Sequence, residues 1–345
     1  MYHSVVDNYM EHLYQEHQAK FNIDLISSAK ELSDWQADLR KEYAACLGVM
    51  PKSSLLDVVI SENKYFEREG FRRLKIEYTF DDALRAPAYV LVPDKPNGAG
   101  VIALHGHGYG VRDIVGLRES GEEREAGEDP GYHKDFALEL VKCGFVVAAP
   151  ELFGFGELML APNPRHMHGG AGNSCFSLTT QLLLYGKTMA GMRVWQGVRM
   201  LEYLMTHDDV DAERIGAMGI SGGGLAASFL AAYEQRVNAC VVSGYLCTYK
   251  DSIMSVHHCV DNFPPGLLNC GEMADLFGLI APRPILIESG THDDIFPIDG
   301  VKSSYARIEA LYNRIGADGK TDIDIFEGGH QISGAKAYDF LLKWL

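Results

Sequence analysis

Runs of apolar residues alternate with segments of helical periodicity along the last two thirds of the chain. The apolar runs have the length of buried strands, and the segments between them gather apolar residues on one helical face, as Val194, Val198 and Leu201 do in the segment 191–207. Strands that are apolar on both faces and alternate with helices are typical of a parallel sheet covered on both sides. We therefore predict an α/β fold with a mostly parallel central sheet and helices on both faces. The predicted strands are 101–104, 145–149, 215–218, 239–242, 284–288 and 323–326, and the predicted helices are 134–143, 191–207, 222–233, 301–315 and 335–345.

The first third of the chain has a different pattern. Val6, Met10 and Leu13 fall on one face of a predicted helix, and a second predicted helix with a similar apolar stripe follows Ser27-Ser28 as its cap. We expect these stripes to pack against the body of the protein or against a partner subunit. Residues 55–93 alternate between apolar and polar positions around a turn, so we expect antiparallel edge strands that lead into the main sheet.

These patterns predict an N-terminal helical extension over residues 1–54 and one α/β domain over residues 55–345. Two long irregular stretches, at about 151–190 and 246–271, interrupt the alternation. Loops of this length in a compact domain are usually functional, and we expect both to form cap-like insertions near the end of the sheet where ligands bind.

The segment Gly219-Ile-Ser221-Gly-Gly223 joins a predicted strand to a predicted helix and fits Gly-x-Ser-x-Gly. Such a nucleophile elbow holds a serine on a strained turn, where small neighbours let the backbone pass close to itself. The amides at the start of the following helix can stabilise a developing oxyanion. A glycine-rich turn that only connects two elements is the competing interpretation, because short motifs also match by chance.

An acid and a histidine follow the elbow in the chain order of an α/β-hydrolase triad. Asp293 comes after the predicted strand 284–288, and His330 comes after the last predicted strand. A serine hydroxyl needs a base to accept its proton, so we assign Ser221 as nucleophile, His330 as base and Asp293 as the residue that orients it. The neighbouring Asp294 would then be a solvated turn residue.

The turn His105-Gly-His-Gly108 follows the first strand of the predicted parallel sheet. There, the backbone N–H of His107 can complete an oxyanion hole with the N–H of Gly222. A metal site is the alternative, because His105 and His107, His166 and His168, or His257 and His258 could each supply ligands. None of these pairs has the spacing of a helical zinc motif, so we expect neither a metal nor another cofactor.

The pocket itself has weaker signals. His257 and His258 lie in the second long stretch, and Glu151 begins the first, so we take these three as candidates to line the substrate pocket. A loop histidine with purely structural contacts is the competing interpretation.

The amino-acid composition disfavours some classes of binding partner. The 345 residues include 31 Lys and Arg against 47 Asp and Glu, a formal charge of −16, which disfavours nucleic acid and anionic membrane surfaces as partners. The seven cysteines include no Cys-x-x-Cys pair, and neither a signal sequence nor a membrane-spanning run is evident. We expect a cytoplasmic protein that acts on a small molecule, and the apolar stripes near the N-terminus are compatible with a homodimer.

With these residues identified, the chain resembles α/β-hydrolase serine esterases of the dienelactone-hydrolase-related and acetyl-xylan-esterase-like group. The resemblance covers nearly the whole chain, and it is carried by segments that include Ala86-Pro-Ala-Tyr89, His105-Gly-His-Gly108, Ala149-Pro-Glu151, Trp195, Val210-Asp-Ala-Glu-Arg-Ile-Gly216, Ser221-Gly-Gly-Gly224, Ala281-Pro-Arg-Pro284 and Gly328-Gly-His330. It implies the same triad and the same oxyanion amides as above. Dienelactone hydrolases proper use a cysteine where this chain has Ser221, and relatives often carry acidic residues at the positions of Glu151 (as Asp) and Gln196.

The expected activity is therefore hydrolysis of small carboxylic esters, acetyl esters included, through an acyl-enzyme. The same triad could act on thioesters or transfer acyl groups, and a catalytically silent scaffold is the alternative of another class. The sequence leaves the acyl and alcohol groups of the substrate open.

Overall fold

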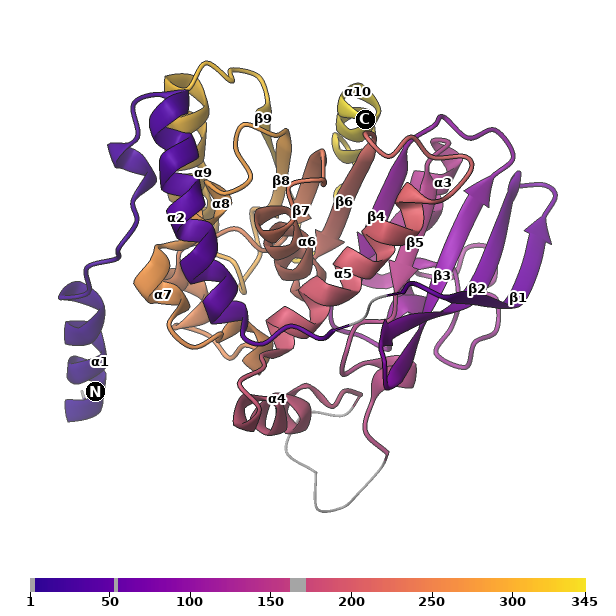
Figure 1. The fold of residues 1–345 in the computed structure, drawn as a ribbon, viewed down its shortest axis with the longest axis horizontal. Coiled ribbons are helices and arrows are strands. Elements are labelled where there is room, and N and C mark those ends of the chain that lie inside the picture. Colours follow the sequence, from indigo (N-terminus) through magenta and orange to yellow (C-terminus); the bar gives the residue numbers. More distant parts are fainter. Residues whose placement is uncertain (1–3, 53–54, 162–171) are drawn as a thin grey trace.

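The computed structural model describes residues 4–52, 55–161 and 172–345. Over these residues the strands form one sheet in the order β1-β2-β3-β5-β4-β6-β7-β8-β9 (Figure 1). Pairing is antiparallel from β1 through β2 and β3 to β5, and parallel from β5 to β9. The strands are β1 (Val58–Phe66), β2 (Phe71–Asp81), β3 (Leu84–Pro93), β4 (Gly100–Leu104), β5 (Val146–Pro150), β6 (Ile215–Ile220), β7 (Ala239–Ser243), β8 (Ile285–Gly290) and β9 (Thr321–Phe326).

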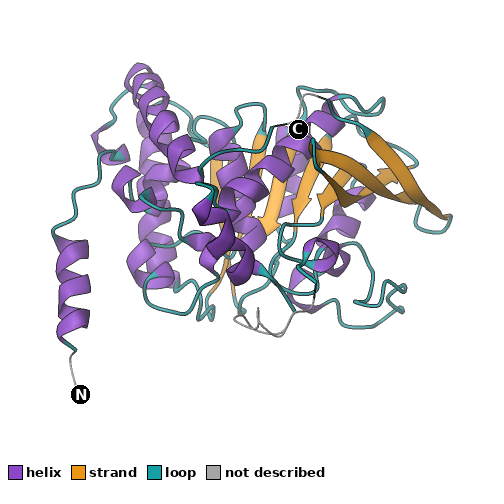
Figure 2. Ribbon diagram, turned by 60° about the horizontal axis from the view of Figure 1, so that its bottom comes forward, coloured by secondary structure: helices purple, strands orange, loops and turns teal. Residues whose placement is uncertain are grey.

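Helices cover both faces of the sheet (Figures 1 and 2). They are α1 (Val5–Gln15), α2 (Ala29–Leu47), α3 (Phe136–Lys142), α4 (Cys175–Leu184), α5 (Met189–Met205), α6 (Gly222–Tyr233), α7 (Leu267–Cys270), α8 (Met273–Phe277), α9 (Ile298–Arg314) and α10 (Ala337–Trp344). The pleat of each strand sends alternate side chains to opposite faces. In β4, Ile102 and Leu104 join the core under α2, α5, α6 and α9, whereas Val101 and Ala103 join the core under α3 and α10. The predicted α/β fold with a mostly parallel sheet is confirmed.

The predicted strands and helices are all present, with ends that differ by a few residues. The antiparallel edge expected in residues 55–93 is formed by β1, β2 and β3. Within the first long stretch, α4 is a regular helix that the sequence did not predict, because its leucines and threonines give no clear amphipathic stripe. Residues 162–171 of that stretch, which include His166 and His168, lie outside the described residues.

The two N-terminal helices differ in how they meet the body. Ser28 caps α2, as predicted, and α2 buries Leu32, Leu39 and Tyr43 in the core. In contrast, α1 buries no residue and lies at the periphery in Figure 2, where Tyr14 donates to Glu272 at 2.8 Å and Glu11 pairs with Lys250 at 2.6 Å. Its stripe of Val6, Met10 and Leu13 is exposed, so of the two predicted alternatives this stripe does not pack on the body of the same chain, and contact with a partner subunit stays a prediction.

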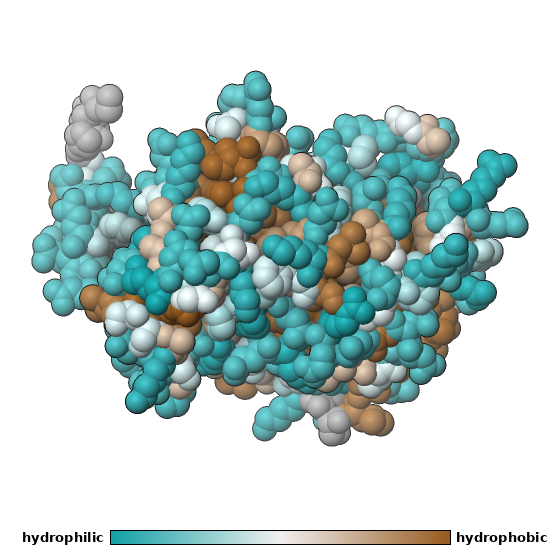
Figure 3. Space-filling model, turned by 90° about the horizontal axis from the view of Figure 1, so that it is seen from above, coloured by the Kyte–Doolittle hydropathy of each residue, from teal (hydrophilic) through white to brown (hydrophobic). Residues whose placement is uncertain are grey.

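The surface seen in Figure 3 is mostly hydrophilic, with apolar residues in separate small groups. None of the helices in the described part of the chain combines the length and the apolar character needed to cross a bilayer.

Arg283 fixes the end of α6, the helix that begins beside Ser221. The Arg283 side chain is half-buried and donates to backbone carbonyls, at 2.5 Å to Ala231, 2.7 Å to Val237, 3.0 Å to Glu234, 3.1 Å to Ile280 and 3.2 Å to Leu279. Carbonyls at the end of a helix have no partner within that helix and attract a cation. Burial lowers the pKa of Arg283 to about 10, so the group stays charged at neutral pH. The guanidinium therefore ties α6 to the segment before β8.

Replacing Arg283 with Lys should lower the free energy of unfolding by about 2–4 kcal/mol, because an ammonium cannot reach this set of carbonyls and leaves several of them unpaired. Urea unfolding followed by tryptophan fluorescence measures the loss. Arg236→Lys is the matched control, since Arg236 lies near the same helix end but is exposed and paired with the Glu234 side chain. Equal stability of the two variants would contradict this role of Arg283.

Candidate active site

The sheet order brings two loops of the predicted site together. β4 pairs with β5 on one side and with β6 on the other, so the connections diverge at β4. Ligands bind beyond the carboxyl ends of parallel strands at such a point. Because Leu104 of β4 lies opposite Gly219 of β6, the turn at residues 105–108 meets the turn at Ser221.

Ser221 sits on a strained turn between β6 and α6. Its backbone has φ 59° and ψ −123°, a conformation that non-glycine residues rarely adopt. Glycine at position 223 is required by close approach, because a Cβ there would lie 2.0 Å from the carbonyl oxygen of Leu104. The turn thus places the Ser221 side chain just beyond the carboxyl end of β6, at the cavity and not in the core, as predicted for a nucleophile elbow.

His330 and Asp293 form a hydrogen-bonded pair. The distance from His330 Nδ1 to Asp293 Oδ2 is 2.7 Å. The other carboxylate oxygen of Asp293 accepts the backbone N–H groups of Ile295 at 2.9 Å and Phe296 at 3.1 Å, so the carboxylate has a fixed orientation. Asp293 is buried and Asp294 is exposed, which matches the roles predicted for these neighbours.

The His330 ring is held between two aromatic rings. Tyr132 lies on one side with a centroid distance of 5.6 Å, and Phe296 stacks on it at 5.7 Å. Gly244, with φ +52°, packs against the edge of the ring, where a Cβ would lie 2.9 Å from Cε1 and 3.0 Å from Nδ1. The position of the imidazole therefore depends on packing as well as on its bond to Asp293.

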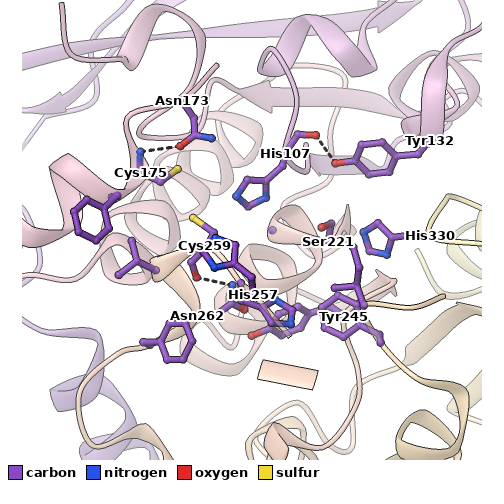
Figure 4. A pocket seen from close by; sticks show the side chains of 17 residues that line it. His107, Tyr132, Asn173, Cys175, Ser221, Tyr245, His257, Cys259, Asn262 and His330 are labelled. Carbon is purple, nitrogen blue, oxygen red and sulfur yellow. Dashed lines mark hydrogen bonds between the residues drawn. The ribbon is translucent and has the colours of Figure 1, made fainter. Parts of the chain in front are cut away.

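Ser221 and His330 line the same cavity and lie next to each other in Figure 4. His330 Nε2 is buried and makes no hydrogen bond to another described residue. The Ser221 hydroxyl instead interacts with the hydroxyl of Tyr132, whose pKa is raised because burial outweighs this hydrogen bond. Ser221 Oγ therefore makes no hydrogen bond to Nε2 in this structure, and catalytic hydrogen bonds often tighten only when substrate binds.

Two backbone amides beside Ser221 are free to donate. The N–H of Gly222 is the first in α6 and has no acceptor within the helix. No acceptor among the described residues takes the N–H of His107, while the carbonyl of His107 accepts the Tyr132 hydroxyl at 2.5 Å. Both residues predicted for the oxyanion hole therefore lie at the cavity, and the backbone N–H of each is available to donate to a ligand.

His105 and Glu151 have structural roles. His105 is fully buried, its Nδ1 lies 2.8 Å from the carbonyl of Gly106, and its Nε2 accepts the N–H of Leu152 at 3.0 Å. Glu151 accepts the N–H of Val111 at 2.9 Å and lies 3.3 Å from His105 Nε2. Glu151 is not among the described residues that line the cavity, so its assignment as a pocket residue is wrong. Through its bond to the N–H of Val111, the Glu151 carboxylate instead helps to fix the loop after β4.

The cavity over Ser221 has a volume of about 800 Å³. His257 and His258 line it, as predicted, together with aromatic and aliphatic side chains. Among its described lining residues none is an Asp, Glu, Lys or Arg. Burial lowers the pKa of His258, whose Nε2 lies 3.0 Å from the hydroxyl of Ser252. The described wall that a ligand would meet therefore carries no carboxylate, ammonium or guanidinium group.

A buried ion pair lies beneath one side of the cavity. Arg193 of α5 binds Asp261, and both side chains are completely inaccessible to solvent. The charge of Arg193 lowers the pKa of Asp261 despite the opposing effect of burial. Arg193 also donates to the sulfur of Cys175 at 3.1 Å and to the carbonyl of Phe153. This pair joins α5 to both long loops.

Sequence analysis did not identify several residues that shape this site. Tyr132 and His133 follow no recognisable motif, yet His133 Nε2 accepts the N–H of Gly106 at 2.9 Å and so orders the loop after β4 that carries His107. Cys175 and Cys259, which sequence analysis did not select, place their sulfurs within 4.8 Å of a ring nitrogen of His107, which it did select. An arginine between the apolar residues Met192 and Val194, near the start of the predicted helix 191–207, was an available signal for Arg193, because a buried charge requires a partner.

Comparison with known proteins places these features in context. The profile of the Abhydrolase family matches residues 3–313. The Bacillus subtilis (strain 168) protein YtaP, which is named as a hydrolase, is 28% identical over 319 residues, covering 90% of this chain and all of that protein.

Two solved structures show the same fold. One, named as an acetyl xylan esterase from Bacteroides fragilis NCTC 9343, has a TM-score of 0.73 at 18% identity and covers 95% of this chain and 83% of its own. The other, a glucuronoyl esterase from Solibacter usitatus, has a TM-score of 0.67 at 14% identity, with coverage of 95% and 98%. At these identities the likeness concerns the fold alone.

Replacing Arg193 with Met should lower the free energy of unfolding by about 3–5 kcal/mol, because Asp261 would be left as an unpaired buried charge. The double variant Arg193→Met with Asp261→Leu should be more stable than Arg193→Met alone. Urea unfolding of the two single variants and the double variant measures this coupling. Additive losses would contradict a direct charge pair.

Proposed function

We propose that this chain, which belongs to the Abhydrolase family, is a serine carboxylesterase that hydrolyses small uncharged esters through an acyl-enzyme. The observation that carries the proposal is the His330–Asp293 pair, whose free Nε2 adjoins a serine on a strained strand-to-helix turn. A family of hydrolases and a built site at the switch point of the sheet support the same conclusion.

In the proposed acylation step, Ser221 Oγ attacks the ester carbonyl carbon while His330 Nε2 accepts the hydroxyl proton. Asp293 holds the proton on Nδ1, which leaves Nε2 as the acceptor, and its negative charge stabilises the imidazolium that forms. His330 then gives the proton to the alcohol oxygen as the carbon–oxygen bond breaks. The acyl group remains on Ser221 until water, activated by His330, releases it as a carboxylate.

The oxyanion of each tetrahedral intermediate would lie between the N–H groups of His107 and Gly222. Preorganised amide donors of this kind stabilise the charge that develops in the transition state, and one donor is typically worth about a hundredfold to a thousandfold in rate. The fixed loop after β4, held by His133 and by Tyr132, supplies one donor, and the start of α6 supplies the other.

The cavity supports an uncharged substrate with an aromatic or sugar-sized alcohol portion. Its volume of about 800 Å³ far exceeds that of an acetyl group, and aromatic rings such as Phe176, Tyr245 and Phe263 face it. Without a cationic side chain among its described lining residues, the cavity offers no ion-pair partner for a carboxylate. We therefore propose a small acyl group, such as acetyl, on a larger neutral alcohol.

The homodimer and the cytoplasmic location expected from sequence stay predictions. The exposed stripe of α1 is the feature that a dimer contact would cover.

Replacing Ser221 with Ala should lower kcat for nitrophenyl acetate by about a millionfold with the fold retained, because the nucleophile is lost and the rest of the triad cannot act without it. Ser228→Ala is the matched control, since this serine lies on the same helix and bonds only its own helix carbonyls. A fluorophosphonate probe should label the parent chain and Ser228→Ala but not Ser221→Ala. Turnover by Ser221→Ala at the rate of the parent chain would contradict the proposal. If the parent chain hydrolyses acyl thioesters faster than matched esters, the activity is that of a thioesterase.

Replacing Gly244 with Ala should lower kcat/KM by about a hundredfold, because the new methyl group would displace the His330 ring from Asp293. Gly316→Ala controls for backbone strain, since Gly316 has a similar φ of +71° with no atom near the new Cβ. Steady-state kinetics and thermal unfolding of both variants separate the two effects. Equal kcat/KM in both would show that the His330 ring does not depend on this contact.

A further inference from the structure

One wall of the cavity brings together two thiols and an imidazole from distant parts of the chain. Cys175 begins α4, Cys259 lies in the loop after β7, and His107 lies in the loop after β4. Their ligand atoms are all within 4.8 Å of one another. In Figure 4 the two sulfur atoms and the His107 ring lie on one side of the cavity, and Ser221 and His330 lie on the other.

Two sulfurs and one imidazole nitrogen are the donor set that thiophilic divalent cations prefer. Zinc ligands lie about 2.0–2.3 Å from the ion, so in a tetrahedron they are roughly 3.3–3.8 Å apart. The three ligand atoms lie within 4.8 Å of one another, so they would have to move closer together by up to about 1 Å around the ion. Three protein ligands would leave a fourth position toward the cavity, which is the open arrangement of many zinc sites.

The surroundings also favour a cation. His107 Nε2 is buried and has no hydrogen-bond partner among the described residues, so the ring has an unused nitrogen. Arg193 and Asp261 neutralise each other beside the cluster, and two thiolates would neutralise a divalent ion. The bond from Arg193 Nη2 to Cys175 Sγ is the kind of outer contact that supports a metal-bound thiolate.

We propose that His107, Cys175 and Cys259 form a binding site for Zn²⁺ at the wall of the cavity. The ion would tie α4 and the loop after β7 to the oxyanion loop after β4, three segments that line the cavity. The His107 ring packs on the start of α6, where a Cβ at Gly222 would lie 3.1 Å from Nδ1, so the site adjoins the catalytic turn. The proposal does not depend on the esterase reaction.

The test is zinc retention by the full chain. Reduced protein is loaded with Zn²⁺, passed through gel filtration into metal-free buffer, and analysed by inductively coupled plasma mass spectrometry. We expect one zinc per chain, and loss of that zinc in both Cys175→Ser and Cys259→Ser. Loading with Co²⁺ should give an intense thiolate-to-cobalt charge-transfer absorption in the parent chain and not in a variant that lacks both cysteines.

Cys46→Ser is the matched control. Cys46 and Cys270 are the other close sulfur pair, 3.6 Å apart, but within the described part of the chain they have no third ligand beside them. This variant should keep the zinc, and Ser221→Ala should keep it as well, which separates the result from any failure of the esterase proposal. Unchanged zinc content in the Cys175 and Cys259 variants would overturn the proposal, as would a parent chain that retains none.

Thiol labelling covers the case in which the cysteine variants do not fold. Iodoacetamide treatment of the parent chain, followed by peptide mass spectrometry, should label Cys175 and Cys259 more slowly with Zn²⁺ than with EDTA, while Cys143 reacts equally in both. Equal labelling of Cys175 and Cys259 in the two conditions would overturn the proposal.

Discussion

The whole site depends on the close approach of two backbone segments, the end of β4 and the turn after β6. Gly223 passes so near the Leu104 carbonyl that any side chain would collide with it. This contact fixes Ser221 in its strained conformation and sets the loop after β4 beside the start of α6. Strain of this kind persists only because the surrounding sheet and helices over-determine it. The proposed nucleophile and the proposed oxyanion amides are therefore positioned by the same backbone contact.

The proposed proton-transfer pair is fixed by packing from outside that turn. Asp293 takes its orientation from two backbone amides, and His330 takes its orientation from Asp293 and from rings on both sides. Because Tyr132 contacts His330, the Ser221 hydroxyl and the carbonyl of His107, one phenol links the proposed base, nucleophile and oxyanion loop. Preorganisation of this type limits the reorganisation that a reaction requires.

The described wall of the cavity contains no Asp, Glu, Lys or Arg, whereas the charged side chains of Arg193 and Asp261 are buried behind it. The Arg193–Asp261 pair is compensated internally, so the two long loops are joined without a net charge below the ligand. Although the chain has a net charge of −16, the described wall over Ser221 contains no Asp, Glu, Lys or Arg. The proposed zinc site would use the same compensation, since the two thiolates would balance the ion.

The sequence by itself determined the fold class and the three residues of the proposed triad. Strand periodicity, the small residues around Ser221 and the chain order of Asp293 and His330 are local signals, because each reflects a neighbouring backbone geometry. Only the tertiary structure decided the role of Glu151, the exposed position of α1, and the convergence of His107, Cys175 and Cys259. These contacts join residues far apart in the chain, and their spacing depends on how loops fold over the sheet. Local periodicity carries no information about that spacing.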